Sequence, residues 1–97
     1  MPAQTAFTPY STATLGVTSA SIAGDIPKSA RVLELQNEGT VTVFVAWAES
    51  AAVATTSDYP VLPGQAKTIT VGPGAGSVAA ITASGTATLY VSAGEGL

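Results

Sequence analysis

The sequence predicts an all-β fold: a single small β-sandwich, of jelly-roll or immunoglobulin-like type, with six to eight antiparallel strands and an extended N-terminal arm. Short runs rich in Val, Thr and Ile recur between turn signals built from Gly, Pro and Asn. Several runs alternate apolar and polar residues with the period of two that a half-buried strand requires. At 97 residues the chain has the size of one domain. We therefore assign residues 1–12 to the arm and residues 13–97 to the sandwich.

Three extended segments are predicted in the first half of the chain. The first covers residues 12–22, and the Gly-Asp-Ile-Pro sequence at 24–27 is typical of a turn. Residues 31–36 alternate, and residues 41–48 carry the strongest strand signal. Residues 37–39 (Asn-Glu-Gly) separate these two strands, and glycine suits the left-handed position of a tight turn. We expect the two strands to pair as an antiparallel hairpin.

The predicted strand 41–48 is apolar on both faces. Val43, Val45 and Trp47 lie on one side, and Phe44 and Ala46 lie on the other. A half-exposed sandwich strand would instead carry polar residues at every second position. Either a loop of the same chain covers the outer face of this strand, or another subunit does. Some cover is needed, because an uncovered strand of this kind would invite aggregation.

The second half of the chain is expected to add further strands. Residues 50–56 favour a strand or a loop over a helix, and the prolines that follow interrupt the chain. Residues 66–71 alternate and form a strand, and the glycine-rich residues 72–76 form a loop. Residues 77–83 and 86–92 flank a Ser-Gly turn signal, so they predict a last hairpin.

Composition argues against several functions. Only 9% of the residues are charged, against about 25% in an average soluble domain. With a net charge of −3 and three basic residues, the chain could not neutralise several phosphates, which argues against nucleic acid and against an anionic membrane surface. The N-terminus lacks a basic region followed by an apolar run, so we expect no signal peptide and assembly in a cytoplasm. Many of the apolar residues are alanines, so the core is thin and a homo-oligomer is expected.

We find no candidate for catalysis, for a metal or for a cofactor. The chain has no histidine and no cysteine, which removes the usual general base and the commonest transition-metal ligands. Its six carboxylates are scattered singly, without the spacing of a calcium loop. The glycines at 72–76 lack the lysine and hydroxyl residue of a phosphate-binding loop, so a plain turn is favoured. We therefore predict a non-enzymatic protein.

Aromatic side chains are the candidates for partner contact. Phe44 lies on the outer face of the apolar strand, Tyr59 stands beside Pro60 on a predicted loop, and Tyr90 lies on the outer face of the last strand. All three could contact a partner protein. The candidates for stacking on a sugar are Tyr59 and Tyr90, together with Tyr10 and Trp47. Trp47 is in register with the inward valines, which favours a place in the core.

Four segments of the chain resemble small β-sandwich proteins of tailed phages. They are Asn37-Glu38-Gly39-Thr40, Val43-Phe44-Val45, Pro60-Val61-Leu62-Pro63-Gly64, and the stretch from Gly85-Thr86-Ala87 through Tyr90-Val91-Ser92 to Gly94-Glu95-Gly96. The chain resembles the capsid decoration (cement) and head-associated proteins. That resemblance implies a virion protein that binds the assembled major capsid protein or other virion subunits without a covalent bond, often as a trimer, and reinforces the shell. A tail, neck or fibre-associated domain, or a carbohydrate- or receptor-binding module, are the alternatives.

Overall fold

The computed structural model describes residues 7–27, 30–71 and 74–96. Within these ranges the chain forms eight β-strands and no helix. The all-β prediction is confirmed. In chain order the strands are β1 (Phe7–Val17), β2 (Ile22–Asp25), β3 (Val32–Asn37), β4 (Val43–Ala48), β5 (Tyr59–Val61), β6 (Ala66–Thr70), β7 (Ser77–Thr82) and β8 (Ala87–Gly96).

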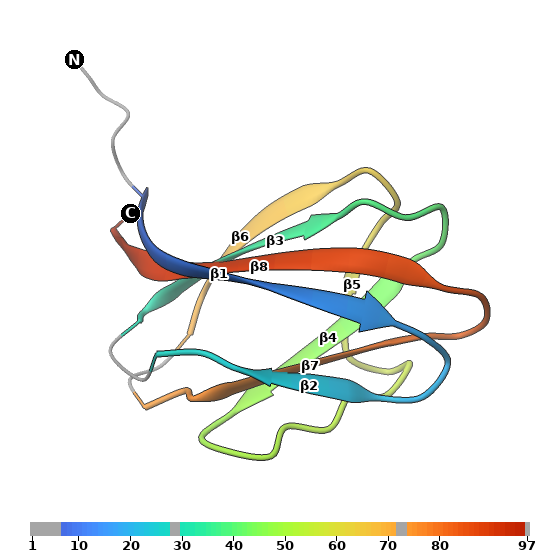
Figure 1. The fold of residues 1–97 in the computed structure, drawn as a ribbon, viewed down its shortest axis with the longest axis horizontal. Helices are drawn as coiled ribbons and strands as arrows, with labels where there is room; N and C mark the ends of the chain where they lie inside the picture. Colours follow the sequence, from blue (N-terminus) through green and yellow to red (C-terminus); the bar gives the residue numbers. More distant parts are fainter. Residues whose placement is uncertain (1–6, 28–29, 72–73, 97) are drawn as a thin grey trace.

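The strands form two antiparallel sheets of four strands each. One sheet has the order β1-β8-β3-β6 and the other has the order β2-β7-β4-β5, and they form two layers (Figure 1). The pairing is nested along the chain. The first strand pairs with the last, β2 pairs with β7, β3 with β6, and β4 with β5. Each sheet therefore takes strands from both halves of the sequence.

A single core lies between the two sheets, in a β-sandwich-like arrangement. The inward positions alternate along each strand, as the sequence predicts: Leu33 and Leu35 on β3, and Leu89 and Val91 on β8, are all buried. Both sheets supply side chains to the same cluster. Its large members are Leu15, Val17, Ile26, Leu33, Leu35, Val43, Val45, Val61, Val71, Val78, Leu89 and Val91.

Both predicted hairpins are wrong. The strands within residues 31–36 and 41–48, β3 and β4, belong to different sheets, and so do β7 and β8. Each connection crosses from one layer to the other instead of returning beside its own strand. Gly39 is not in the left-handed region either; among the described glycines only Gly64, Gly74 and Gly85 have positive φ. A Cβ on Gly39 would lie 2.4 Å from Ala87 Cβ, so this glycine serves close packing of the loop on β8.

The N-terminal third of the chain also differs in its boundaries. The extended region expected over residues 12–22 is two strands, because β1 ends at Val17 and β2 begins at Ile22 in the other sheet. Gly24 and Asp25, expected in a turn, belong to β2. Residues 7–12 of the expected arm are part of β1, and residues 1–6 lie outside the described residues.

The loop over residues 49–58 covers part of the outer face of the β2-β7-β4-β5 sheet. Ala52 and Ala54 of this loop pack against Ala79 of β7, with Ala46 of β4 beside them. The backbone N–H of Ala52 donates to Ser77 Oγ (3.0 Å), and that of Ala54 donates to the Oγ of Ser21 (2.9 Å). A loop of the same chain therefore covers Ala46 on the apolar strand. Phe44, two residues earlier, remains half-exposed.

We expect Ser77→Ala to lower the free energy of unfolding by about 1–2 kcal/mol, because the buried N–H of Ala52 loses its acceptor. Urea denaturation measures the change. Ser84→Ala, at an exposed position in the turn between β7 and β8, is the matched control and should shift the midpoint little. Equal losses in the two variants would contradict this account of the loop.

Candidate functional site

The three predicted contact residues do not form one site. Phe44 lies on the outer face of the β2-β7-β4-β5 sheet, opposite Pro60 and Ile81 in the neighbouring strands. Tyr90 lies on the outer face of the other sheet. Tyr59 is on the edge strand β5, rather than on a loop, and is half-buried. Three separate surfaces therefore carry them.

Tyr59 helps to close one side of the sandwich. Its ring meets Trp47 edge-on, with 6.3 Å between the ring centroids, and both side chains pack against the core. The Nζ of Lys67 lies 4.8 Å from the Tyr59 ring centroid, which is a cation–π contact. Lys67 is opposite the buried Leu35 in the ladder, so it lies on the inward face of its strand. The packing of Trp47 agrees with the expected core position.

Tyr90 is surrounded by neutral polar groups. It is 38% exposed and lies between Thr14 of β1 and Gln36 of β3 in the ladder. One step along, the hydroxyls of Thr12 and Ser92 are 3.0 Å apart and hydrogen-bonded. This sheet face therefore offers hydroxyl and amide groups around one aromatic ring, with Glu34 as the nearby charge on β3.

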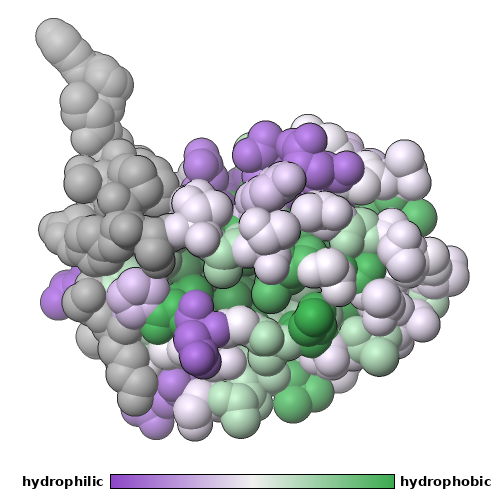
Figure 2. Space-filling model, in the orientation of Figure 1, coloured by the Kyte–Doolittle hydropathy of each residue, from purple (hydrophilic) through white to green (hydrophobic). Residues whose placement is uncertain are grey.

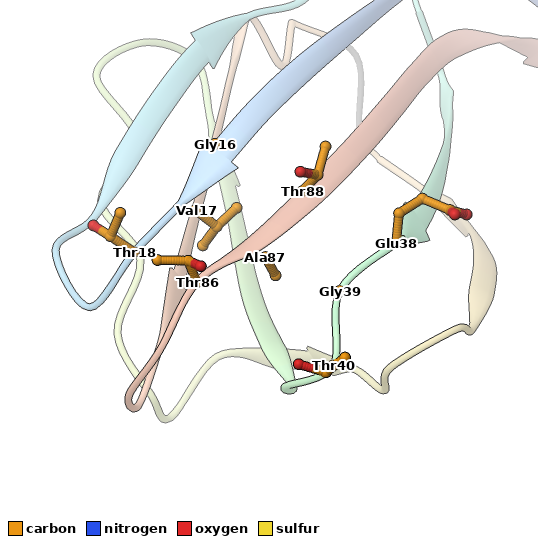
Figure 3. A pocket seen from close by; sticks show the side chains of 9 residues that line it. All are labelled: Gly16, Val17, Thr18, Glu38, Gly39, Thr40, Thr86, Ala87 and Thr88. Carbon is orange, nitrogen blue, oxygen red and sulfur yellow. The ribbon is translucent and has the colours of Figure 1, made fainter.

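Two shallow hollows adjoin at one end of the sandwich, where the loops over residues 18–21, 38–42, 62–65 and 83–86 gather (Figure 1). Their volumes are about 470 and 390 Å³, and Thr40 lines both. Figure 3 shows the larger one, with β1, β8 and the 38–42 loop around it. Its lining is Gly16, Val17, Thr18, Glu38, Gly39, Thr40, Thr86, Ala87 and Thr88; the smaller hollow adds Val41, Thr42, Phe44, Pro63, Ala83 and Ser84. We call these four loops the loop end.

Asn37 holds the loop end together. This side chain is fully buried, and its Nδ2 donates to the carbonyl oxygens of Val41 (2.9 Å) and Val61 (3.0 Å). Its Oδ1 accepts from the N–H of Gly39 at 2.8 Å. Because Asn37 is on β3 and Val61 is on β5, these bonds tie the two sheets together. The sequence predicts a turn at Asn37 and gives no sign of this role.

The lining of the loop end is mostly neutral and polar. Four threonine hydroxyls and one carboxylate, that of Glu38, line the larger hollow. Figure 3 shows the Glu38 side chain directed away from Thr86 and Thr88. The described part of the chain holds no group of three or more His, Cys, Asp or Glu that could bind a metal ion. Sequence reasoning missed this surface, because its residues come from four segments far apart in the chain.

The fold and this surface define a small, sandwich-like all-β domain with few charges. In the described ranges, no helix is long and apolar enough to cross a membrane. No protein-family model matches the sequence, and no curated protein is similar enough to it to count as a relative.

Proposed function

We propose that this chain is a non-enzymatic structural subunit of a phage-like particle, which binds the assembled capsid shell from outside and reinforces it. The observation that carries the proposal is the nested strand pairing in a domain of which only 9% of the residues are charged. The fold class and the surface support the proposal independently, and the resemblance to decoration proteins, which covers most of the chain from about Arg31 onward, agrees with both.

We further propose that the fold is a jelly roll. The first strand pairs with the last, the second with the seventh, the third with the sixth and the fourth with the fifth. This nested pairing results when one long antiparallel ribbon is rolled up. In a constant-type immunoglobulin sandwich, by contrast, the first and last strands belong to opposite sheets. Jelly rolls of eight strands are common in viral capsid domains and in lectins.

The surface suits a subunit that is present in many copies. A net charge of −3 gives little long-range repulsion between neighbours, and hydroxyl groups can pair with protein backbone or side chains at small desolvation cost. Many weak contacts on one shell act together. Binding also adds to the stability of a thin-cored domain by mass action. The absence of His and Cys from the sequence supports a role in contact rather than in chemistry.

We place the shell contact at the loop end. Loops held by a rigid scaffold commonly carry binding residues. Leu62 in this region is 51% exposed beside Pro63 and near the half-buried Phe44. Because Phe44 is opposite Pro60 in the ladder, Leu62 follows on the same face, and an exposed leucine there extends an apolar surface of the kind that marks protein contact sites.

We expect Leu62→Glu to weaken binding to assembled shells at least about tenfold, because a charge would be buried at the centre of the contact. The control is Val53→Glu, in the 49–58 loop, where the valine is 70% exposed but outside the loop end. Co-sedimentation over a range of chain concentrations measures both. Equal binding by the two variants would remove the contact from the loop end.

The N-terminal arm is also part of the proposal. The part of the expected arm that precedes β1, residues 1–6, would contact neighbouring subunits, so its deletion should weaken shell binding. Unchanged binding after this deletion would exclude that role.

The place of the chain on the particle can be tested separately. If the chain belongs to the tail, neck or fibre, it should co-sediment with purified tails and not with tail-free heads.

A carbohydrate- or receptor-binding module is the second candidate, and the two adjoining hollows favour it. The Glu38 carboxylate of the larger hollow could accept hydrogen bonds from sugar hydroxyls, while a pyranose face stacks on the Phe44 ring of the adjoining smaller hollow. A glycan array with the purified chain tests this reading. Binding that Glu38→Gln abolishes would favour the module, and a blank array would leave the shell subunit as the better account.

A further inference from the structure

We infer that β1 is a self-pairing edge, through which two copies of this chain join as an antiparallel β1–β1 contact. Each sheet has two edge strands, so the sandwich has four edges that could pair with another strand: β1, β2, β5 and β6. Natural sheets protect such edges by shortness, proline, bulges or inward-pointing charges. Three of the four edges have such protection, and most of β1 has none.

The protection of the other three edges is specific. β5 has three residues and contains Pro60, and β2 has four residues and ends at Asp25. β6 carries Lys67 on its inward face, with its Nζ over the Tyr59 ring. An incoming strand beside β6 would have to displace or bury this ammonium group.

β1 differs in length and in charge. It has 11 residues, none of them charged, and in the described part of the chain β8 is its one pairing partner. The register shift between Pro9 and Ser11 disrupts its first part. Residues 11–17 then run without proline or bulge to the end of the strand. Every second residue of this seven-residue stretch therefore presents its backbone N–H and C=O along an unprotected edge.

The surface beside this edge is apolar. β1 and β2 face the viewer in Figure 1, and Figure 2 shows hydrophobic surface along the seam between the two sheets on that side. Ile22, the first residue of β2, is 38% exposed, and Leu15 of β1 lies against Gly24 of β2. A strand added to β1 would extend its sheet past this seam and cover Ile22.

A second copy fits the edge better than a charged partner. Two uncharged β1 strands can lie antiparallel without any like charges opposite each other. A two-fold axis at Thr14 would pair Thr14 with Thr14 and Thr12 with Gly16 of the partner, and both chains would contribute the same surface. The contact is independent of shell binding, and it predicts a dimer rather than the trimer that the resemblance to decoration proteins implies.

The test is the mass of the free chain by light scattering across a dilution series, compared for wild type, Thr14→Glu and Thr70→Glu. Thr14 and Thr70 are both exposed on the outer face of the same sheet, one on each edge strand. We expect the wild type and Thr70→Glu to reach twice the monomer mass as concentration rises. Thr14→Glu places two carboxylates opposite each other and should remain a monomer over the same range.

Amide hydrogen exchange keeps the test decisive if Thr14→Glu folds poorly. In the wild type, protection of β1 amides should increase with protein concentration while that of β6 amides stays constant. A chain that is monomeric at every concentration, a trimer, or equal association of the two folded variants would overturn the β1–β1 contact. None of these results depends on whether the chain binds a shell.

Discussion

Asn37→Leu should be among the most destabilising single substitutions in this protein. The substitution keeps a side chain of similar size but removes three hydrogen bonds, to Val41 O, Val61 O and the N–H of Gly39. Each buried group left without a partner costs about 1–3 kcal/mol. The bond to Val61 is buried and the other two are part-buried, which lowers their cost, so we expect a total loss of about 3–6 kcal/mol. Small domains are stable by only about 5–15 kcal/mol, so the loss is a large part of the whole.

Denaturant unfolding followed by tryptophan fluorescence measures this change, because Trp47 packs against the core. Gln36→Leu is the matched control, since Gln36 is the neighbouring residue on β3 and its side chain is exposed. It should change the free energy of unfolding by less than about 0.5 kcal/mol. If Asn37→Leu were as mild as this control, the hydrogen bonds of Asn37 would not be what joins the two sheets.

Gly39→Ala should be nearly as damaging, although it adds a single methyl group. That methyl would lie 2.4 Å from Ala87 Cβ and 2.8 Å from Ala87 Cα, and the second atom belongs to the backbone of β8. The 38–42 loop must therefore move away from β8, which strains the hydrogen bond from Gly39 N–H to Asn37 Oδ1. We expect a loss of about 2–4 kcal/mol in a urea titration.

Two variants show whether the close approach causes this loss. Gly16→Ala is the control, because a Cβ there meets nothing within 4 Å; it should be tolerated. The double variant Gly39→Ala with Ala87→Gly removes one of the two clashing atoms, so it should lose less stability than the sum of the single changes. Strict additivity would contradict the steric explanation.

The face of each strand could be predicted from the sequence, and the sheet that each strand joins could not. Alternation placed Leu33, Leu35, Leu89 and Val91 inward, because burial of one face imposes a period of two. The same local signals gave two wrong hairpins. Turn residues show where a strand ends, but they do not show whether the chain returns beside that strand or crosses to the other layer. Here Asn37 ties the crossing together through Val61, which is 24 residues away in the chain.

For the outer face of β4, the sequence predicted that a cover is needed but not which segment provides it. The apolar residues of this strand predicted a cover of some kind, and the sequence left open whether loop or subunit provided it. In the structure the 49–58 loop covers Ala46, held by Ser77 and Ser21. The contact candidates were chosen one strand at a time, so Phe44, Tyr59 and Tyr90 fall on three surfaces. The hollows of the loop end are formed by four loops, and no single segment predicts them.

Co-sedimentation of the purified chain with assembled shells of the particle encoded by the same genome tests the central claim most directly. The account predicts saturable binding to assembled shells, no binding to unassembled capsid protein, and shells that withstand higher temperature when the chain is bound. A chain that stays in the supernatant with intact shells, at concentrations where it is folded, would contradict it.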